Sequence, residues 1–152
     1  MNVYIFDIDG VLADLRHRLC YRRSRDFDTF YEDSKVLADK LIQPGKELLR
    51  IMKQDGLVAY ATGRPEKTRK ATIEWLHKNR LPLCSVFMRK DGDFRPSPEV
   101  KVEQVMEILG CCCGIDKVWF IDDDPKNVAA VEEAFAGAKI KVNGLVYGTK
   151  RF

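Results

Sequence analysis

The chain has 152 residues, 45% hydrophobic and 32% charged, a size typical of one domain and a composition too apolar for a disordered chain. Its apolar runs are far shorter than the roughly 20 residues of a membrane span, and acidic residues interrupt the place of a signal peptide, so we expect neither. The formal charge of +3 is too small for a non-specific nucleic-acid coat but permits a local basic patch.

Five segments are typical of β-strands: in chain order they are residues 3–8, 57–61, 84–88, 118–121 and, more weakly, 139–147. The first four are continuous apolar runs, as in strands that are buried on both faces. Segments with helical periodicity, such as residues 102–109, lie between them. This alternation predicts one α/β domain over residues 1–152, a three-layer, Rossmann-like parallel sheet of about five strands.

An insertion after the first strand, residues 14–44, does not follow this alternation. It is polar and rich in arginine and aromatic residues. We expect it to form a small cap with two short helices.

Prolines mark the expected helix starts, because proline suits the first turn of a helix. The positions are Pro65, Pro98 and Pro125. Ser97 and Asp124 precede two of them and are expected to be N-caps.

Five cysteines are present, three of them consecutive at positions 111–113. An odd number without a secreted disulfide pattern predicts a reducing, cytoplasmic compartment. The triplet is either the end of a helix beside Gly110 or a soft-metal ligand cluster.

Polar side chains follow each of the first four predicted strands. They lie in residues 7–10, 62–64, 89–95 and 122–124. Ligands of open α/β sheets bind at the carboxyl ends of the strands. The pattern therefore predicts a site where carboxylates, a hydroxyl and guanidinium groups meet.

The acidic residues of this site suit a hard cation. Asp7 and Asp9 are two residues apart in an extended segment, so they either share a proton or recruit a cation. With Asp124 assigned to a helix cap, Asp122 and Asp123 remain, and oxygen ligands without His or Cys favour Mg²⁺ over Zn²⁺. The alternatives are a strand-ending turn at Asp-x-Asp-Gly and a plain acidic loop.

The remaining groups suit an anion. Thr62 and the Gly63 N–H open a helix and could bind phosphate, with Arg64 adding a planar guanidinium group. Lys101 is expected in the first turn of a helix, where the helix dipole disfavours a cation, which often marks a functional residue. The alternatives are ordinary turn chemistry at Thr62-Gly63 and a solvated surface lysine.

Together, these motifs in this order resemble the haloacid dehalogenase (HAD) superfamily of phosphohydrolases. The resemblance covers nearly the whole chain and is closest to the 3′-phosphatase domain of polynucleotide kinases. The stretches that carry it are residues 6–13 with Arg18, residues 62–64, residues 92–95 with Lys101, and residues 121–123. One departure is Ser97, where the family usually has an acidic residue. Both residue types can cap a helix, so we expect this difference to affect the activity and not the fold.

The resemblance implies roles for the catalytic residues. Asp7 would be the nucleophile that forms an aspartyl phosphate, and Asp9 the general acid and then base. Thr62 and the Gly63 N–H would hold the phosphate, and Lys101 would neutralise its charge.

The resemblance also implies a magnesium cofactor. The Asp7 carboxylate, the Asp9 carbonyl and the Asp122/Asp123 pair would bind Mg²⁺, which offsets the repulsion between a carboxylate nucleophile and a phosphate dianion.

A phosphate ester, either a nucleic-acid end or a nucleotide, is the expected substrate. The cap is small enough to leave the site open, and Arg18, Arg64, Arg89 and Arg95 could contact neighbouring phosphates. No phosphate-binding loop of the kinase type is present, which predicts a free-standing phosphatase, and no motif indicates an oligomeric state. The alternatives are a nucleotidase acting on free mononucleotides, a receiver-like phospho-acceptor and a catalytically silent phosphate-binding module.

Overall fold

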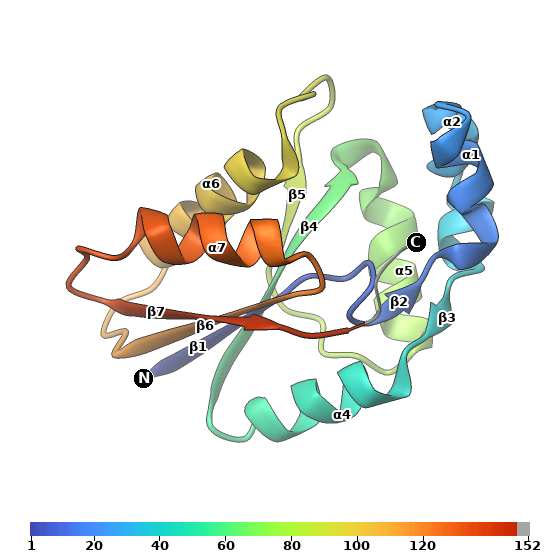
Figure 1. The fold of residues 1–152 in the computed structure, drawn as a ribbon. Helices are drawn as coiled ribbons and strands as arrows, with labels where there is room; N and C mark the ends of the chain where they lie inside the picture. Colours follow the sequence, from blue (N-terminus) through green and yellow to red (C-terminus); the bar gives the residue numbers. More distant parts are fainter. Residues whose placement is uncertain (149–152) are drawn as a thin grey trace.

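Five parallel strands form the central sheet of the computed structural model, which describes residues 1–148 (Figure 1). The strands are β1 (Asn2–Phe6), β4 (Gly56–Pro65), β5 (Val86–Arg89), β6 (Lys117–Asp122) and β7 (Lys141–Val146). Their order in the sheet is β5-β4-β1-β6-β7. The predicted α/β fold is confirmed, and all five predicted strands are present. Residues 149–152, the end of the predicted domain, lie outside the described residues.

Helices cover both faces of the sheet. The helices α6 (Ser97–Gly110) and α7 (Pro125–Ala134) pack on one face, and α4 (Gln43–Met52) and α5 (Arg69–Lys78) on the other (Figure 1). In β1, Val3 and Ile5 point into the core with α6 and α7, while Tyr4 and Phe6 point into the core with α4 and α5. Two buried faces explain why this strand is a continuous apolar run.

Two of the predicted helix starts were misplaced. Pro125 opens α7 as predicted, and Asp124 caps it by accepting from Lys126 N at 2.9 Å. Ser97, however, is the first residue of α6 and makes no capping bond, because Pro96 precedes it in the N-cap position. Pro65 has extended backbone angles and pairs with β5, so α5 begins later, after the short 3-10 helix η2 (Glu66–Thr68).

The cap, residues 13–41, has three short α-helices instead of the predicted two. They are α1 (Leu19–Arg23), α2 (Phe27–Phe30) and α3 (Asp33–Leu37), preceded by the 3-10 helix η1 (Arg16–Arg18). The antiparallel strands β2 (Ala13–Asp14) and β3 (Lys40–Leu41) close its base. Arg25, with φ of 61°, breaks the helical path between α1 and α2, and the Asp26 side chain then caps α2. Leu15, Leu19 and Phe30 form the cap's own core.

The cysteine triplet lies at the end of α6, where Cys111 is the C-cap residue. All five cysteines are free thiols, and the groups of potential metal ligands within residues 1–148 include none of them. The helix-end alternative therefore fits the structure. No helix of the described chain has the length and apolar character needed to cross a membrane.

Candidate active site

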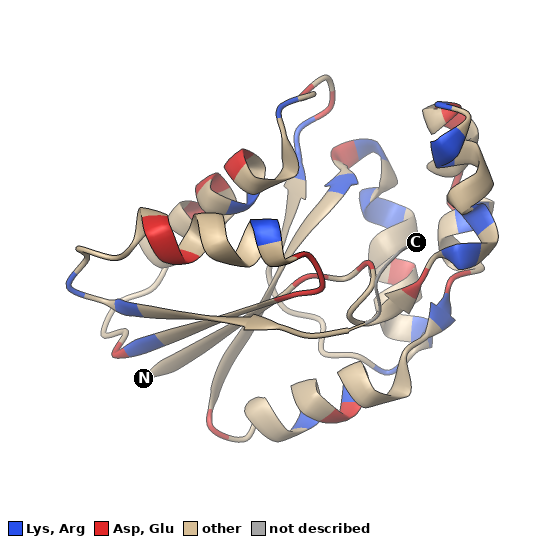
Figure 2. Cartoon of the chain, viewed as in Figure 1, with Lys and Arg blue, Asp and Glu red and all other residues tan. Residues whose placement is uncertain are grey.

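The strand-end residues singled out in the sequence come together at the carboxyl end of the sheet. Asp7 follows β1, Thr62 lies in the last part of β4, and Asp122 ends β6. These ends are neighbours because β1 lies between β4 and β6. Figure 2 shows the acidic segments after β1 and β6 close to each other, near the first turn of α7.

Three carboxylates form the centre of the site. Asp7, Asp122 and Asp123 each offer an oxygen atom within 4.8 Å of the others, and all three residues are buried. Asn127, from α7, donates its amide N–H groups to both Asp122 oxygens at 3.1 Å, and the Asp124 N–H donates to Asp122 Oδ1 at 2.8 Å. These hydrogen bonds fix the orientation of Asp122. Such a set of hard oxygen ligands fits Mg²⁺.

Lys101 lies between two of these carboxylates. It is the fifth residue of α6, a little beyond the first turn in which it was expected, and it is only 1% exposed. Its ammonium group is 2.8 Å from Asp7 Oδ1 and 3.2 Å from Asp122 Oδ2, and it donates to the Ala61 carbonyl at 2.5 Å. The surface-lysine alternative is therefore excluded. Lys101 thus places one positive charge beside the three carboxylates.

The end of β4 borders this cluster. Thr62 is buried, and its hydroxyl oxygen accepts from Arg64 N at 3.2 Å. Gln104, one turn after Lys101, donates to the Thr62 carbonyl at 2.9 Å and so anchors the strand end to α6. A Cβ atom at Gly63 would meet nothing within 4 Å, so its backbone lies beside open space. Gly63 thus borders open space, next to the buried Thr62.

The segment after β7 forms a wall of the site that the sequence did not indicate. The Tyr147 N–H donates to the Asp122 carbonyl at 2.9 Å. Gly148 has φ of +118° and packs against Gly10, and a Cβ atom there would lie 3.3 Å from the Asp123 Cβ. Only glycine adopts this conformation readily, so the close approach requires it.

Arg18 and Arg64, predicted to contact substrate phosphates, are fully buried beside Asp9. Arg64 donates through Nε and Nη2 to Asp9 Oδ1, at 2.9 and 2.6 Å, and Arg18 Nη2 lies 3.5 Å from the same oxygen. The Asp9 carboxylate thus faces two guanidinium groups, Arg18 from the cap and Arg64 from β4. Contact of either arginine with a substrate stays a prediction.

Asp39, at the end of the cap, completes this network and was missed in the sequence. Its side chain is fully buried and accepts hydrogen bonds from both Arg18 and Arg64. No motif contains it. The available signal was a balance of charge, since two arginines near one acid require a second anion if they are buried.

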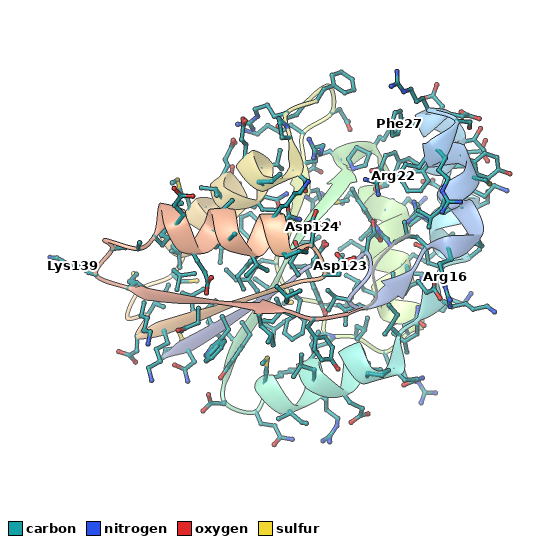
Figure 3. The ribbon with its side chains drawn as sticks, viewed as in Figure 1. Arg16, Arg22, Phe27, Asp123, Asp124 and Lys139 are labelled. Carbon is teal, nitrogen blue, oxygen red and sulfur yellow. The ribbon has the colours of Figure 1, made fainter. Side chains whose placement is uncertain are left out.

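A groove with a volume of about 440 Å³ runs from Asp9 and Gly63 between the cap and the loop after β5. Phe27 lines it from the cap and Phe94 from the loop, and their exposed fractions are 48% and 94%. Figure 3 shows Arg22 and Phe27 on the side of the cap that faces the sheet. Five cationic residues also line the groove: Arg22, Lys67, Arg89, Lys90 and Arg95.

Three of these cations are paired with carboxylates. Arg95, predicted to bind substrate, is 2.7 Å from Asp93 and 2.5 Å from Glu103, and it holds the pKa of Asp93 at about 2. Lys67 and Lys90 are also paired with acids. Within residues 1–148, Arg22 and Arg89 form no ion pair with a carboxylate, and Arg89 donates only to backbone carbonyls. Among the cationic residues of the groove, Arg22 and Arg89 are therefore the ones for which a substrate anion competes least with carboxylates of the described chain.

Comparisons with known proteins agree with this geometry. A family model described as "Polynucleotide kinase PNKP phosphatase domain" matches residues 1–130. No curated protein matches the chain. Among solved structures, a chain of the Pnkp1/Rnl/Hen1 complex is 24% identical, with a TM-score of 0.69. That alignment covers 98% of this chain and 47% of the other, so the chain spans about half the length of that relative.

Two further structures share the fold. A hydrolase from Streptococcus pneumoniae TIGR4 is 15% identical with a TM-score of 0.60, and the alignment covers 97% of this chain and 92% of that one. A HAD hydrolase of family IA, variant 3, from Entamoeba histolytica is 12% identical with a TM-score of 0.62, covering 95% and 84%. With its parallel sheet, its buried acidic centre and a family match over residues 1–130, the chain belongs to the polynucleotide kinase phosphatase-domain family of HAD phosphatases.

Proposed function

We propose that the chain is a magnesium-dependent phosphomonoesterase that removes the 3′-phosphate from a DNA or RNA end. The observation that carries this proposal is the convergence of Asp7, Asp122, Asp123 and Lys101 beside Thr62. The family match supports a phosphate ester on a nucleic-acid end as the substrate. A cytoplasmic location is part of the same proposal and rests on the odd number of cysteines in the sequence.

In the first half-reaction, a carboxylate oxygen of Asp7 forms a bond to phosphorus while the bond from phosphorus to the 3′-oxygen breaks. Asp9 donates a proton to that leaving oxygen, and Asp7 becomes an aspartyl phosphate. Lys101, 2.8 Å from Asp7, offsets the charge of the phosphoryl oxygens. Thr62 and the Gly63 N–H are proposed to bind those oxygens.

In the second half-reaction, a water molecule attacks phosphorus and Asp9 accepts its proton. The bond from phosphorus to Asp7 breaks, so inorganic phosphate leaves and Asp7 is restored. Asp9 therefore acts as acid and then as base, which requires its carboxyl to remain in place through both steps.

The group formed by Asp7, Asp122 and Asp123 fits a magnesium ion, because three buried residues each offer a hard carboxylate oxygen within 4.8 Å of the others. Asp7, Asp122 and Asp123 would hold the ion, together with the Asp9 carbonyl. The ion would supply positive charge that offsets the repulsion between the nucleophilic carboxylate and the phosphate.

The groove favours a nucleic-acid strand over a free mononucleotide. It continues from Asp9 past two exposed phenylalanines and two arginines without carboxylate partners in the described chain. Aromatic faces stack on bases and arginines bind phosphodiesters, so this lining suits nucleotides that precede the terminal phosphate. A mononucleotide would leave this part of the groove empty.

The proposal is tested by measuring phosphate release from a 3′-phosphorylated single-stranded oligonucleotide, from its 5′-phosphorylated counterpart and from 3′- and 5′-mononucleotides. Each assay is run with Mg²⁺ and with a chelator. We expect the highest kcat/KM for the 3′-phosphorylated oligonucleotide, and only with Mg²⁺. A preference for mononucleotides would identify a nucleotidase, and turnover in the chelator would remove magnesium from the proposal.

Replacing Arg22 or Arg89 by Gln is expected to raise KM for the 3′-phosphorylated oligonucleotide by about 5- to 10-fold, with kcat nearly unchanged, because a phosphodiester contact is lost. KM for p-nitrophenyl phosphate, which has no phosphodiester for these arginines to bind, should stay the same. Arg23→Gln is the matched control, because Arg23 follows Arg22 on α1, is exposed and is not among the residues that line the groove. An equal effect of all three variants would show that the groove has no such role.

Replacing Asn127 by Ala is expected to weaken Mg²⁺ binding by about 10- to 100-fold, because Asp122 loses the amide that orients both of its oxygens. The measurement is the Mg²⁺ concentration that gives half-maximal phosphate release. Asn143→Ala, which removes a side-chain bond to a carbonyl of β6, is the control and should leave this concentration unchanged. An unchanged midpoint in Asn127→Ala would mean that Asp122 needs no such support.

A further inference from the structure

Asp39 belongs to the cap but contacts residues of the central sheet and of α5, next to the candidate active site. Its carboxylate accepts from Arg18 Nε and Nη2 at 2.8 and 2.7 Å, and from Arg64 Nη2 at 2.8 Å. Trp75, on α5, donates its indole N–H to the Asp39 carbonyl at 2.8 Å. The side chains of Asp39, Arg18 and Arg64 are all 0% exposed. His17 Nε2 lies 2.8 Å from Asp39 Oδ1, so Asp39 is held by the core, by the two arginines and by His17.

The charge of Asp39 decides where the two guanidinium groups can lie. An unbalanced buried charge is strongly destabilising, and Asp9 can balance at most one guanidinium when it is ionised and none when it carries the proton that it donates. Asp39 binds Arg18 in a two-pronged contact, while Arg18 Nη1 donates to the Phe30 carbonyl at 3.0 Å. Arg18 Nη2 lies 3.5 Å from Asp9 Oδ1, and Arg64 makes the shorter contacts with the same oxygen, at 2.6 and 2.9 Å.

We propose that Asp39 is a positioning residue for Asp9 and acts through Arg64 and Arg18. The cap thereby holds the Asp9 carboxyl in the position from which it transfers a proton to the leaving oxygen. The inference rests on the proposed function, in which Asp9 transfers that proton. It assigns the cap a part in the chemistry, in addition to any part in binding substrate.

A merely structural role is the rival explanation, because loss of Asp39 could loosen the cap and lower all activity equally. The dependence of rate on the leaving group separates the two. Phosphate esters with poor leaving groups need a proton from the general acid, whereas esters of acidic phenols do not. A misplaced Asp9 therefore slows the first class and spares the second, whereas a loosened cap slows both.

The experiment measures kcat/KM for a series of phenyl phosphates, from dinitrophenyl to unsubstituted phenyl, in the wild-type chain, Asp39→Asn and Asp9→Asn. We expect Asp39→Asn to lower kcat/KM about 30- to 100-fold for phenyl phosphate and less than about 3-fold for dinitrophenyl phosphate. The double variant, which carries both Asp39→Asn and Asp9→Asn, should have a kcat/KM for phenyl phosphate no lower than that of Asp9→Asn alone. Asp55→Asn, which loses bonds to Asn2 and Tyr4 away from the site, is the matched control and should not change the series.

Equal losses across the series, or a double variant slower than Asp9→Asn, would overturn the inference and leave a structural role. If Asp39→Asn does not fold, Trp75→Phe serves instead, because it removes the bond to the Asp39 carbonyl and keeps an aromatic ring in the core. Trp75→Phe should lower kcat/KM for phenyl phosphate more than for dinitrophenyl phosphate, by a smaller factor than Asp39→Asn. An equal decrease for both esters would contradict the inference. Wild-type chain that releases no phosphate from any ester would refute the proposed function itself, a result distinct from either of these.

Discussion

Asp7→Asn is expected to reduce kcat for phosphate release by about 10⁴-fold or more, the size of effect that follows removal of a nucleophile. An amide cannot form the aspartyl phosphate, and no other described carboxylate is in the same position at the end of β1. The fold should survive, because Lys101 keeps its second carboxylate, Asp122, at 3.2 Å. Phosphate release and far-UV circular dichroism measured on the same preparations test both parts of this expectation.

Acid-quench trapping makes the test specific to the covalent step. With a ³²P-labelled 3′-phosphorylated oligonucleotide, the wild-type chain should carry label on protein, and Asp7→Asn should carry none. Asp124→Asn is the matched control in the same part of the site, because Asn caps a helix as well as Asp and the backbone contact to Asp122 is kept. Label or turnover retained in Asp7→Asn would exclude a phosphorylated Asp7.

The fold and the central acids could be predicted from the sequence for one physical reason. Strands buried on both faces are continuous apolar runs, and parallel strands bring their carboxyl ends to one edge. Once β1, β4 and β6 were identified, the residues after them were expected at one edge of the sheet, and the observed order β4-β1-β6 makes them neighbours. Lys101 was identifiable because its charge is unfavourable in a helix N-terminal region unless an anion is near, and Asp7 supplies that anion.

The arginine network could not be predicted in the same way. A guanidinium group binds phosphate and carboxylate equally well, so Arg18 and Arg64 pointed to an anion without identifying it. The partner in the structure, Asp39, comes from an insertion whose path depends on Arg25 and on the Asp26 cap, features with no regular period. The helix start at Pro65 failed for a related reason, since sheet pairing with β5 outweighed the local preference of proline.

Lys101→Met is expected to lower kcat by about 10³-fold while making the chain more dependent on Mg²⁺ for its stability. The ammonium is the charge that stabilises the phosphoryl group in the proposed mechanism, and loss of one such group costs about this much. Its removal also changes the formal charge of the cluster from −2 to −3, with all three carboxylates buried. Removing a counter-charge from buried carboxylates destabilises a fold by several kcal/mol.

Thermal unfolding in a chelator and in increasing Mg²⁺ tests the second part of this expectation. In the chelator, Lys101→Met should unfold at a lower temperature than the wild-type chain, and Mg²⁺ should raise its midpoint by a larger amount, because the ion is then the main source of positive charge. Lys126→Met is the matched control, since Lys126 is exposed in the first turn of α7. A smaller Mg²⁺ effect in Lys101→Met than in the wild-type chain would mean that the ammonium and the ion do not share one anionic centre.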